Sequence, residues 1–103
     1  MREINYLNDL VSSGRIELYP LHPTIRRAVE RSVEITGEAV WQLRQVDETI
    51  AAGITVAREI VAVRTILAHD YRKVDPEVIL TVVRQYLPSM LREILALRPG
   101  ELP

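Results

Sequence analysis

The sequence contains no cysteine and a single lysine, Lys73. Without cysteine the chain can form neither a disulfide framework nor a thiolate metal site, which suits a cytoplasmic protein. With one lysine, nearly all positive charge is carried by arginine, whose planar guanidinium can form two parallel hydrogen bonds to a carboxylate or phosphate group. The composition therefore excludes the disulfide-rich secreted classes and makes arginine the main cation.

Long apolar runs are also missing. The longest run, Ile50 to Ala57, ends at Arg58 and is far shorter than the roughly 20 residues that a membrane-spanning helix needs. The first segment does not resemble a signal peptide, because it is interrupted by Glu3, Asn5, Asn8 and Asp9. We therefore expect a cytoplasmic protein that has no membrane partner.

Neither sign of charge dominates, since 13 basic and 14 acidic residues give a formal net charge of −1. Strong nucleic-acid binding depends on clustered cations that displace counterions, so only a local basic patch remains open. The 103 residues, 48% of them hydrophobic, are typical of one compact domain rather than a disordered chain. A small core can be supplemented by oligomerisation, so a dimer is considered.

Apolar residues recur three and four positions apart through most of the chain, as in helices that pack on a core. The pattern predicts a short first helix over residues 1–14, a second helix over 23–45 and a third over 55–70. Residues 15–23 are expected to form an irregular connector, because two prolines interrupt the pattern there. Helix therefore dominates the prediction.

Particular residues mark helix ends and close contacts. Thr55 is the expected N-cap of the third helix, and Asp75 that of a fourth helix, which Pro88 should kink. Asp47 to Ala52 could hold an additional helical turn. Gly37 lies inside the second helix at a cost of about 1 kcal/mol relative to alanine, which indicates a close helix contact at that point.

The predicted fold is all-α, an up-and-down bundle of about four helices. We expect a single domain over residues 1–103, with residues 98–103 as a tail. The sequence has no Gly-rich phosphate loop and no nucleophile elbow. Two isolated histidines without a carboxylate cluster at ligand spacing do not make a metal site, so neither a metal nor a cofactor is predicted.

Arg64 and His69 lie near the predicted end of the third helix, in "RTILAHDY". Histidine transfers protons near neutral pH, and arginine stabilises charge that develops on a phosphate. Together they could cleave RNA without a metal, the 2′-hydroxyl attacking the adjacent phosphate. On an ideal helix the two side chains point about 140° apart. They can meet only if the helix ends or distorts near His69, or if a second subunit completes the site.

The same two residues also have a simpler interpretation. A histidine at a helix C-terminus interacts favourably with the negative end of the helix dipole, and the arginine can belong to a surface ion pair. The chemistry of the side chains leaves both interpretations open. The other histidine, His22, lies between two prolines in the connector and is interpreted as structural or without a role.

Three segments, taken in order, resemble the HepT-like toxin branch of the HEPN superfamily. Arg64 to Tyr71 resembles its R-x-x-x-x-H-x-Y signature, and "RAVERSVEITGEAV", Arg27 to Val40, is similar to a helix that carries a Gly-Glu-Ala run. "KVDPEVILTVVRQYLPSML", Lys73 to Leu91, is similar to the segment that follows the signature. The similarity covers the chain from His22 to Leu97.

The resemblance implies an all-α homodimer in which signature residues of both subunits face a shared cleft. It implies a ribonuclease toxin, acting on RNA, with Arg64 and His69 as catalytic residues. It further implies an MntA-like nucleotidyltransferase as antitoxin, which transfers AMP to Tyr71. These are expectations that come from the family and not from helix geometry.

The resemblance also suggests supporting residues, namely Glu38, Thr65 and Asp70. Glu38 matches the acidic position of the Gly-Glu-Ala run, although an ordinary surface glutamate explains it equally well. Thr65 stands where the family usually has an amide or an acid, and the first helix is shorter than usual.

These departures keep a second function open. It is a non-catalytic helical interaction module that binds the nucleotidyltransferase and presents Tyr71 to it. A plain helical dimer without any ligand is the fallback. In neither case would Arg64 and His69 act on RNA.

Overall fold

Four main helical stretches build the fold of the computed structural model, which describes residues 2–96 apart from the side chain of Tyr71. The all-α, HEPN-like bundle predicted from the sequence is confirmed, and the predicted tail over residues 98–103 lies outside the described residues. In chain order the elements are α1 (Arg2–Ser13), the 3₁₀ turn η1 (Arg15–Leu18), α2 (Pro23–Val46), α3 (Glu48–Ala52), α4 (Ala57–His69), the 3₁₀ turn η2 (Tyr71–Lys73), α5 (Pro76–Thr81), the π-helical η3 (Val82–Tyr86) and α6 (Leu87–Leu95).

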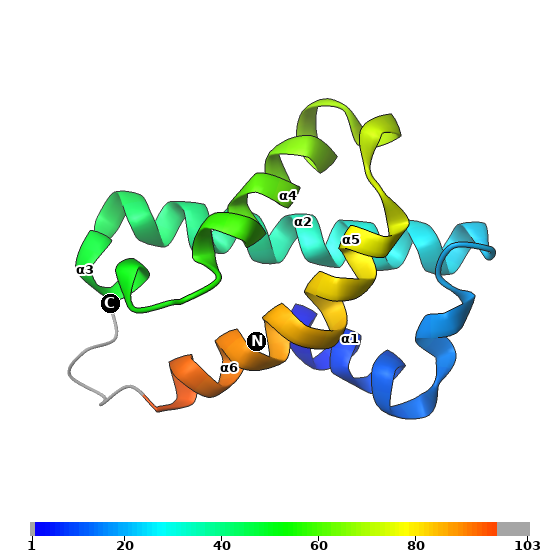
Figure 1. The fold of residues 1–103 in the computed structure, drawn as a ribbon, viewed down its shortest axis with the longest axis horizontal. Helices are drawn as coiled ribbons and strands as arrows, with labels where there is room; N and C mark the ends of the chain where they lie inside the picture. The colour runs from blue at the N-terminus through cyan, green and yellow to red at the C-terminus, as the bar shows by residue number, and fades with distance from the viewer. Residues whose placement is uncertain (1, 97–103) are drawn as a thin grey trace.

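Helix α2 runs along the long axis of the molecule and contacts both α1 and α4 (Figure 1). Helix α4 crosses it, so that the C-terminal end of α4 and the η2 turn extend beyond one edge of α2, while α1 and α6 lie on the opposite side. Buried aliphatic side chains from all these helices fill the core, among them Leu7, Val29, Val33, Ile60, Ile79, Val82 and Leu87. The amphipathic stripes in the sequence therefore correspond to one shared core.

Two helix starts have side-chain caps, one predicted at Asp75 and one not predicted at His22. The Asp75 side chain accepts a hydrogen bond from the backbone N–H of Glu77 at 2.9 Å, and Pro76 occupies the first turn of α5. His22 caps α2, because its Nδ1 accepts a hydrogen bond from the backbone N–H of Ile25 at 3.4 Å. This agrees with the interpretation of His22 as structural.

The predicted N-cap at Thr55 is wrong. Helix α4 begins at Ala57, after Val56, which makes no side-chain capping bond. The backbone N–H and the hydroxyl of Thr55 both donate instead to Glu93 of α6, each at 3.1 Å. A local capping pattern was therefore overridden by a tertiary contact that ties the α3–α4 loop to α6. The optional helical turn over Asp47 to Ala52 is present as α3.

The predicted connector contains the short 3₁₀ helix η1 and is anchored by a buried tyrosine. Gly14 ends α1 in the left-handed conformation at φ 79°, which glycine adopts without strain. The Tyr19 hydroxyl donates to Oε2 of Glu30 at 2.5 Å, and Nε of Arg26 donates to the same oxygen at 3.1 Å. Burial and the bond to Glu30 raise the pKa of Tyr19, so the hydroxyl stays protonated and fixes the connector to α2.

The last helix is interrupted before Pro88, as predicted. Proline has no N–H to donate, and its ring would clash with the carbonyl of Arg84 in a regular α-helix. The chain responds with a π-helical turn, in which the N–H of Leu87 donates to the carbonyl of Val82, five residues earlier. Val82, Val83 and Leu87 nevertheless remain buried, so the distortion keeps the apolar face of this helix on the core.

Candidate functional site

Helices α2 and α4 approach each other closely at Gly37. A methyl group on Gly37 would overlap the Cβ of Arg64 and would lie 3.1 Å from the backbone oxygen of Ile60. The close helix contact predicted from a glycine inside α2 is therefore confirmed. Because the two backbones are this near, the Arg64 side chain must leave α4 along the surface of α2.

The guanidinium of Arg64 is held by two residues of α2. Its Nε donates to Oε2 of Glu38 at 2.7 Å, and its Nη2 lies 2.5 Å from the same oxygen. Its Cζ lies 5.3 Å from the centroid of the Trp41 ring, a cation–π distance. The Arg64 side chain is 20% exposed, so this ion pair is partly buried and not a loose surface pair.

His69 faces solvent at the other side of α4. It is the last residue of the helix and is exposed, and the backbone N–H of the following Asp70 donates to the carbonyl of Ile66. The helix does end near His69, but the chain from Arg64 to His69 stays α-helical, which keeps the two side chains about 140° apart. The end of the helix alone therefore does not bring them together within one chain.

The remaining predicted site residues are placed around the end of α4. The Thr65 hydroxyl donates to the carbonyl of Val61 at 3.0 Å, so it is used within its own helix. Asp70 forms an ion pair with Lys73 at 3.4 Å across the η2 turn. Tyr71 opens η2, but its side chain, the predicted modification site, lies outside the described residues.

The arrangement presents two chemically useful groups. A guanidinium has five N–H donors, and two of the Arg64 nitrogens face Glu38, which leaves donors for a phosphate. The exposed imidazole of His69 is accessible for proton transfer. Histidine at a helix C-terminus is equally compatible with a purely electrostatic role.

Trp41 is the residue of this site that the sequence reasoning did not assign. From the sequence we expect Trp41 in the core or at an interface; the residue is 38% exposed, so it does not belong to the core, and its ring lies beside Arg64. Its position three residues after Glu38 on α2 was the available signal, because residues three apart on a helix are neighbours on one face. Glu38 and Trp41 together therefore define the position of Arg64.

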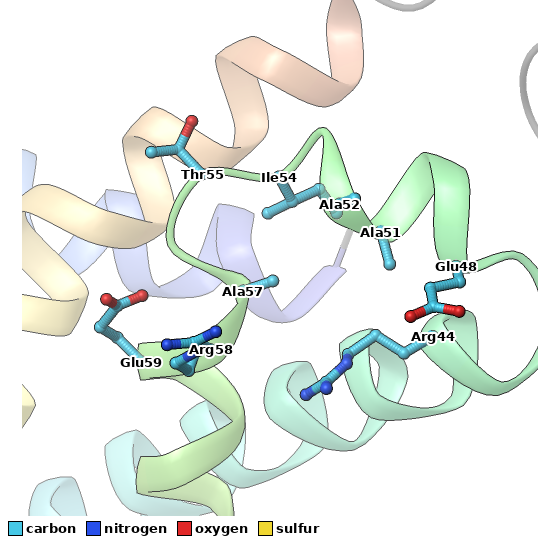
Figure 2. A pocket seen from close by; sticks show the side chains of 9 residues that line it. All are labelled: Arg44, Glu48, Ala51, Ala52, Ile54, Thr55, Ala57, Arg58 and Glu59. Carbon is cyan, nitrogen blue, oxygen red and sulfur yellow. The ribbon is translucent and has the colours of Figure 1, made fainter.

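Residues 2–96, the part of the chain that the structure describes, contain neither a candidate membrane span nor a candidate metal site. No helix in this range combines the length and apolar character needed to cross a membrane. The same range holds no group of three or more histidine, aspartate and glutamate side chains placed to bind a metal ion. A pocket of about 460 Å³ lies at the N-terminal end of α4 (Figure 2). His69 is the last residue of the same helix, so the pocket and His69 lie at opposite ends of it.

Comparison with known protein families gives a match over most of the chain. The model of the family described as "Ribonuclease HepT-like" matches residues 4–97, a range that includes Arg64, His69 and the residues that hold Arg64. The searches of curated proteins and of solved structures returned no match. The family match spans nearly the whole chain, and the chain therefore belongs to the ribonuclease HepT-like family.

Proposed function

We propose that this protein is a metal-independent endoribonuclease that acts as the toxin of a toxin–antitoxin pair. The observation that carries the proposal is the placement of Arg64 within the region matched by the ribonuclease family. Glu38 and Trp41 fix its guanidinium while leaving N–H donors for a phosphate. His69 supplies an accessible imidazole on the same helix. These are the groups that RNA cleavage without a metal requires.

The active form is proposed to be a homodimer. Arg64 and His69 of one chain point in different directions, so a shared site needs His69 of a second copy beside Arg64 of the first. The exposed ring of Trp41, next to Arg64, supplies apolar surface for such a contact. In a twofold dimer the contact occurs twice, which gives two equivalent sites.

The proposed reaction is a transfer within the RNA strand. The 2′-oxygen forms a bond to the adjacent phosphorus while the bond from phosphorus to the 5′-oxygen of the next nucleotide breaks. The His69 imidazole of the site accepts the proton of the 2′-hydroxyl and becomes an imidazolium, which then gives that proton to the departing 5′-oxygen. The Arg64 guanidinium stabilises the charge on the phosphoryl oxygens. The products are a 2′,3′-cyclic phosphate and a free 5′-hydroxyl.

The proposed antitoxin is an MntA-like nucleotidyltransferase that transfers AMP to Tyr71. Tyr71 opens η2, two residues after His69. An AMP group at this point would place a negatively charged phosphate close to the proposed catalytic imidazole and would compete electrostatically with the RNA phosphate. Modification would therefore silence the site without unfolding the bundle.

One observation favours the second candidate, a non-catalytic module that binds the nucleotidyltransferase. The Thr65 hydroxyl donates its proton to the carbonyl of Val61 within α4, so this position has neither the amide or acid that the family usually has after the signature arginine nor a free donor. Modification of Tyr71 by the partner, with intact RNA after incubation with the unmodified protein, would identify the module.

The deciding experiment is an RNA cleavage assay with purified protein in the presence of a metal chelator. We expect cleavage that persists without divalent ions and yields 2′,3′-cyclic phosphate ends. Prior incubation with ATP and an MntA-like nucleotidyltransferase should add AMP to Tyr71, seen by mass spectrometry, and should stop cleavage. Products with 3′-hydroxyl ends, or cleavage that stops with the chelator, would contradict the proposed chemistry.

A further inference from the structure

The pocket at the N-terminal end of α4 is lined by two arginines from different helices. It has a volume of about 460 Å³ and lies between the C-terminal end of α2, the short α3 and the first turn of α4. Ala51, Ile54 and Ala57 form its buried floor, and Arg44 from α2 and Arg58 from α4 line it (Figure 2). In the view of Figure 2 the Arg44 side chain extends toward the α4 side of the pocket.

The two arginines are available for a ligand. Within the described part of the chain, the ion pairs within 4.0 Å involve other arginines (Arg26, Arg31 and Arg64) together with Lys73, and neither Arg44 nor Arg58 takes part. Glu48 and Glu59 also line the pocket, but neither carboxylate is paired with these guanidinium groups. In Figure 2 both carboxylates lie at the outer ends of the group, away from the space between the arginines. Two guanidinium groups that line one pocket and take part in none of these ion pairs favour a phosphate, which guanidinium binds by charge-assisted hydrogen bonds.

The pocket shares a face of α4 with the proposed catalytic histidine. Arg58 and His69 are eleven positions apart, which corresponds to three turns plus about 20° and to about 16.5 Å along the helix axis. Ala62 and Thr65 lie between them on this face, and both are exposed and small. A single strand of RNA that has one phosphate at His69 can therefore reach Arg58 a few nucleotides away.

We infer that Arg44 and Arg58 form a subsite for a backbone phosphate of the RNA, a few nucleotides from the bond that is cleaved. The inference rests on the proposed ribonuclease function and adds to it a direction for the strand along α4. Phosphate contacts of this kind position a strand without reading its sequence. The subsite would also give local RNA affinity to a chain whose formal net charge is −1.

Binding tests the subsite separately from catalysis. The probe is a fluorescent RNA oligonucleotide with 2′-O-methyl groups, which cannot be cleaved by its own 2′-hydroxyls, and the readout is fluorescence anisotropy over a range of salt concentrations. The Arg44→Ala and Arg58→Ala double variant should bind about tenfold more weakly, because its side chains no longer donate charge-assisted hydrogen bonds to a phosphate. The slope of log Kd against log salt concentration should fall by about 0.7, because the double variant neutralises one phosphate fewer. Arg84→Ala removes an exposed arginine of η3 and serves as the control, with unchanged binding.

Cleavage of long and short substrates gives a second readout. The double variant should raise KM for a natural oligonucleotide but cleave a dinucleotide at the wild-type rate, because a dinucleotide does not reach the subsite. If the double variant binds RNA as tightly as Arg84→Ala does, the proposed phosphate subsite is refuted. The proposed function still stands in that case, provided that the wild-type protein cleaves RNA. If RNA binds with the expected dependence on Arg44 and Arg58 but is not cleaved, the subsite stands and the catalytic proposal fails. A wild-type protein that binds no RNA overturns both.

Discussion

Replacement of His69 by alanine is expected to lower the rate of RNA cleavage by about 10²–10⁴-fold, the usual contribution of a general acid–base residue. The side chain is exposed at the end of α4 and takes no part in the core, so the free energy of unfolding should change little. The measurement is the rate of oligonucleotide cleavage together with a chemical denaturation curve for the same sample.

The other histidine of the chain provides a matched control. His22→Ala removes the N-cap of α2, which should cost up to about 1 kcal/mol of stability and leave cleavage unchanged. The two variants thus separate a chemical effect from a structural one. A His69→Ala protein that cleaves RNA at the wild-type rate would show that His69 only interacts with the helix dipole, as in its simpler interpretation.

Gly37→Ala is expected to destabilise the protein by about 1–3 kcal/mol, the usual cost of inserting a methyl group into a packed contact. At an unconstrained position inside a helix the same change would stabilise by about 1 kcal/mol, so the sign of the effect is diagnostic. The added methyl group would overlap the Cβ of Arg64, next to the backbone oxygen of Ile60. It would force α4 away from α2 and move Arg64 from Glu38 and Trp41, which should lower cleavage as well.

Chemical denaturation measures the stability change, and Trp41, the single tryptophan, reports by fluorescence on the displacement of Arg64. Ala39→Gly, at an exposed position of the same helix, is the control for helix propensity and should cost about 1 kcal/mol. If Gly37→Ala proved more stable than the wild type, the close approach of α2 and α4 at Arg64 would be refuted.

The helices could be predicted because their signals are local. The apolar stripe of α2, the cap at Asp75 and the interruption before Pro88 each depend on residues within a few positions of one another. The close contact at Gly37 was predictable for a related reason, since a glycine inside a helix needs a compensating contact. Thr55 was placed wrongly because its partner, Glu93, is distant in the sequence and meets it only in the folded chain.

The sequence was sufficient to name candidate site residues, but it was not sufficient to predict which side chains they contact. The signature pointed to Arg64 and His69, and the angle between them on a helix indicated that they meet only if the helix ends or distorts near His69 or if a second subunit completes the site. The ion pair of Arg64 with Glu38 and the contact with Trp41 depend on how α4 crosses α2, which helix periodicity does not specify. The pocket that Arg44 and Arg58 both line was missed for the same reason. These residues belong to different helices, which the short α3 joins, and only the folded chain places both at one pocket.

The proposal that Arg64 of one copy acts with His69 of another can be tested by mixing two inactive variants. Arg64→Ala and His69→Ala proteins are unfolded together and refolded, so that mixed dimers form, and RNA cleavage is measured against each variant refolded alone. Half of the dimers should be mixed and each should carry one intact site of two, so recovery of up to about a quarter of the wild-type rate is predicted. A mixture that remains as inactive as either variant alone would contradict the shared site.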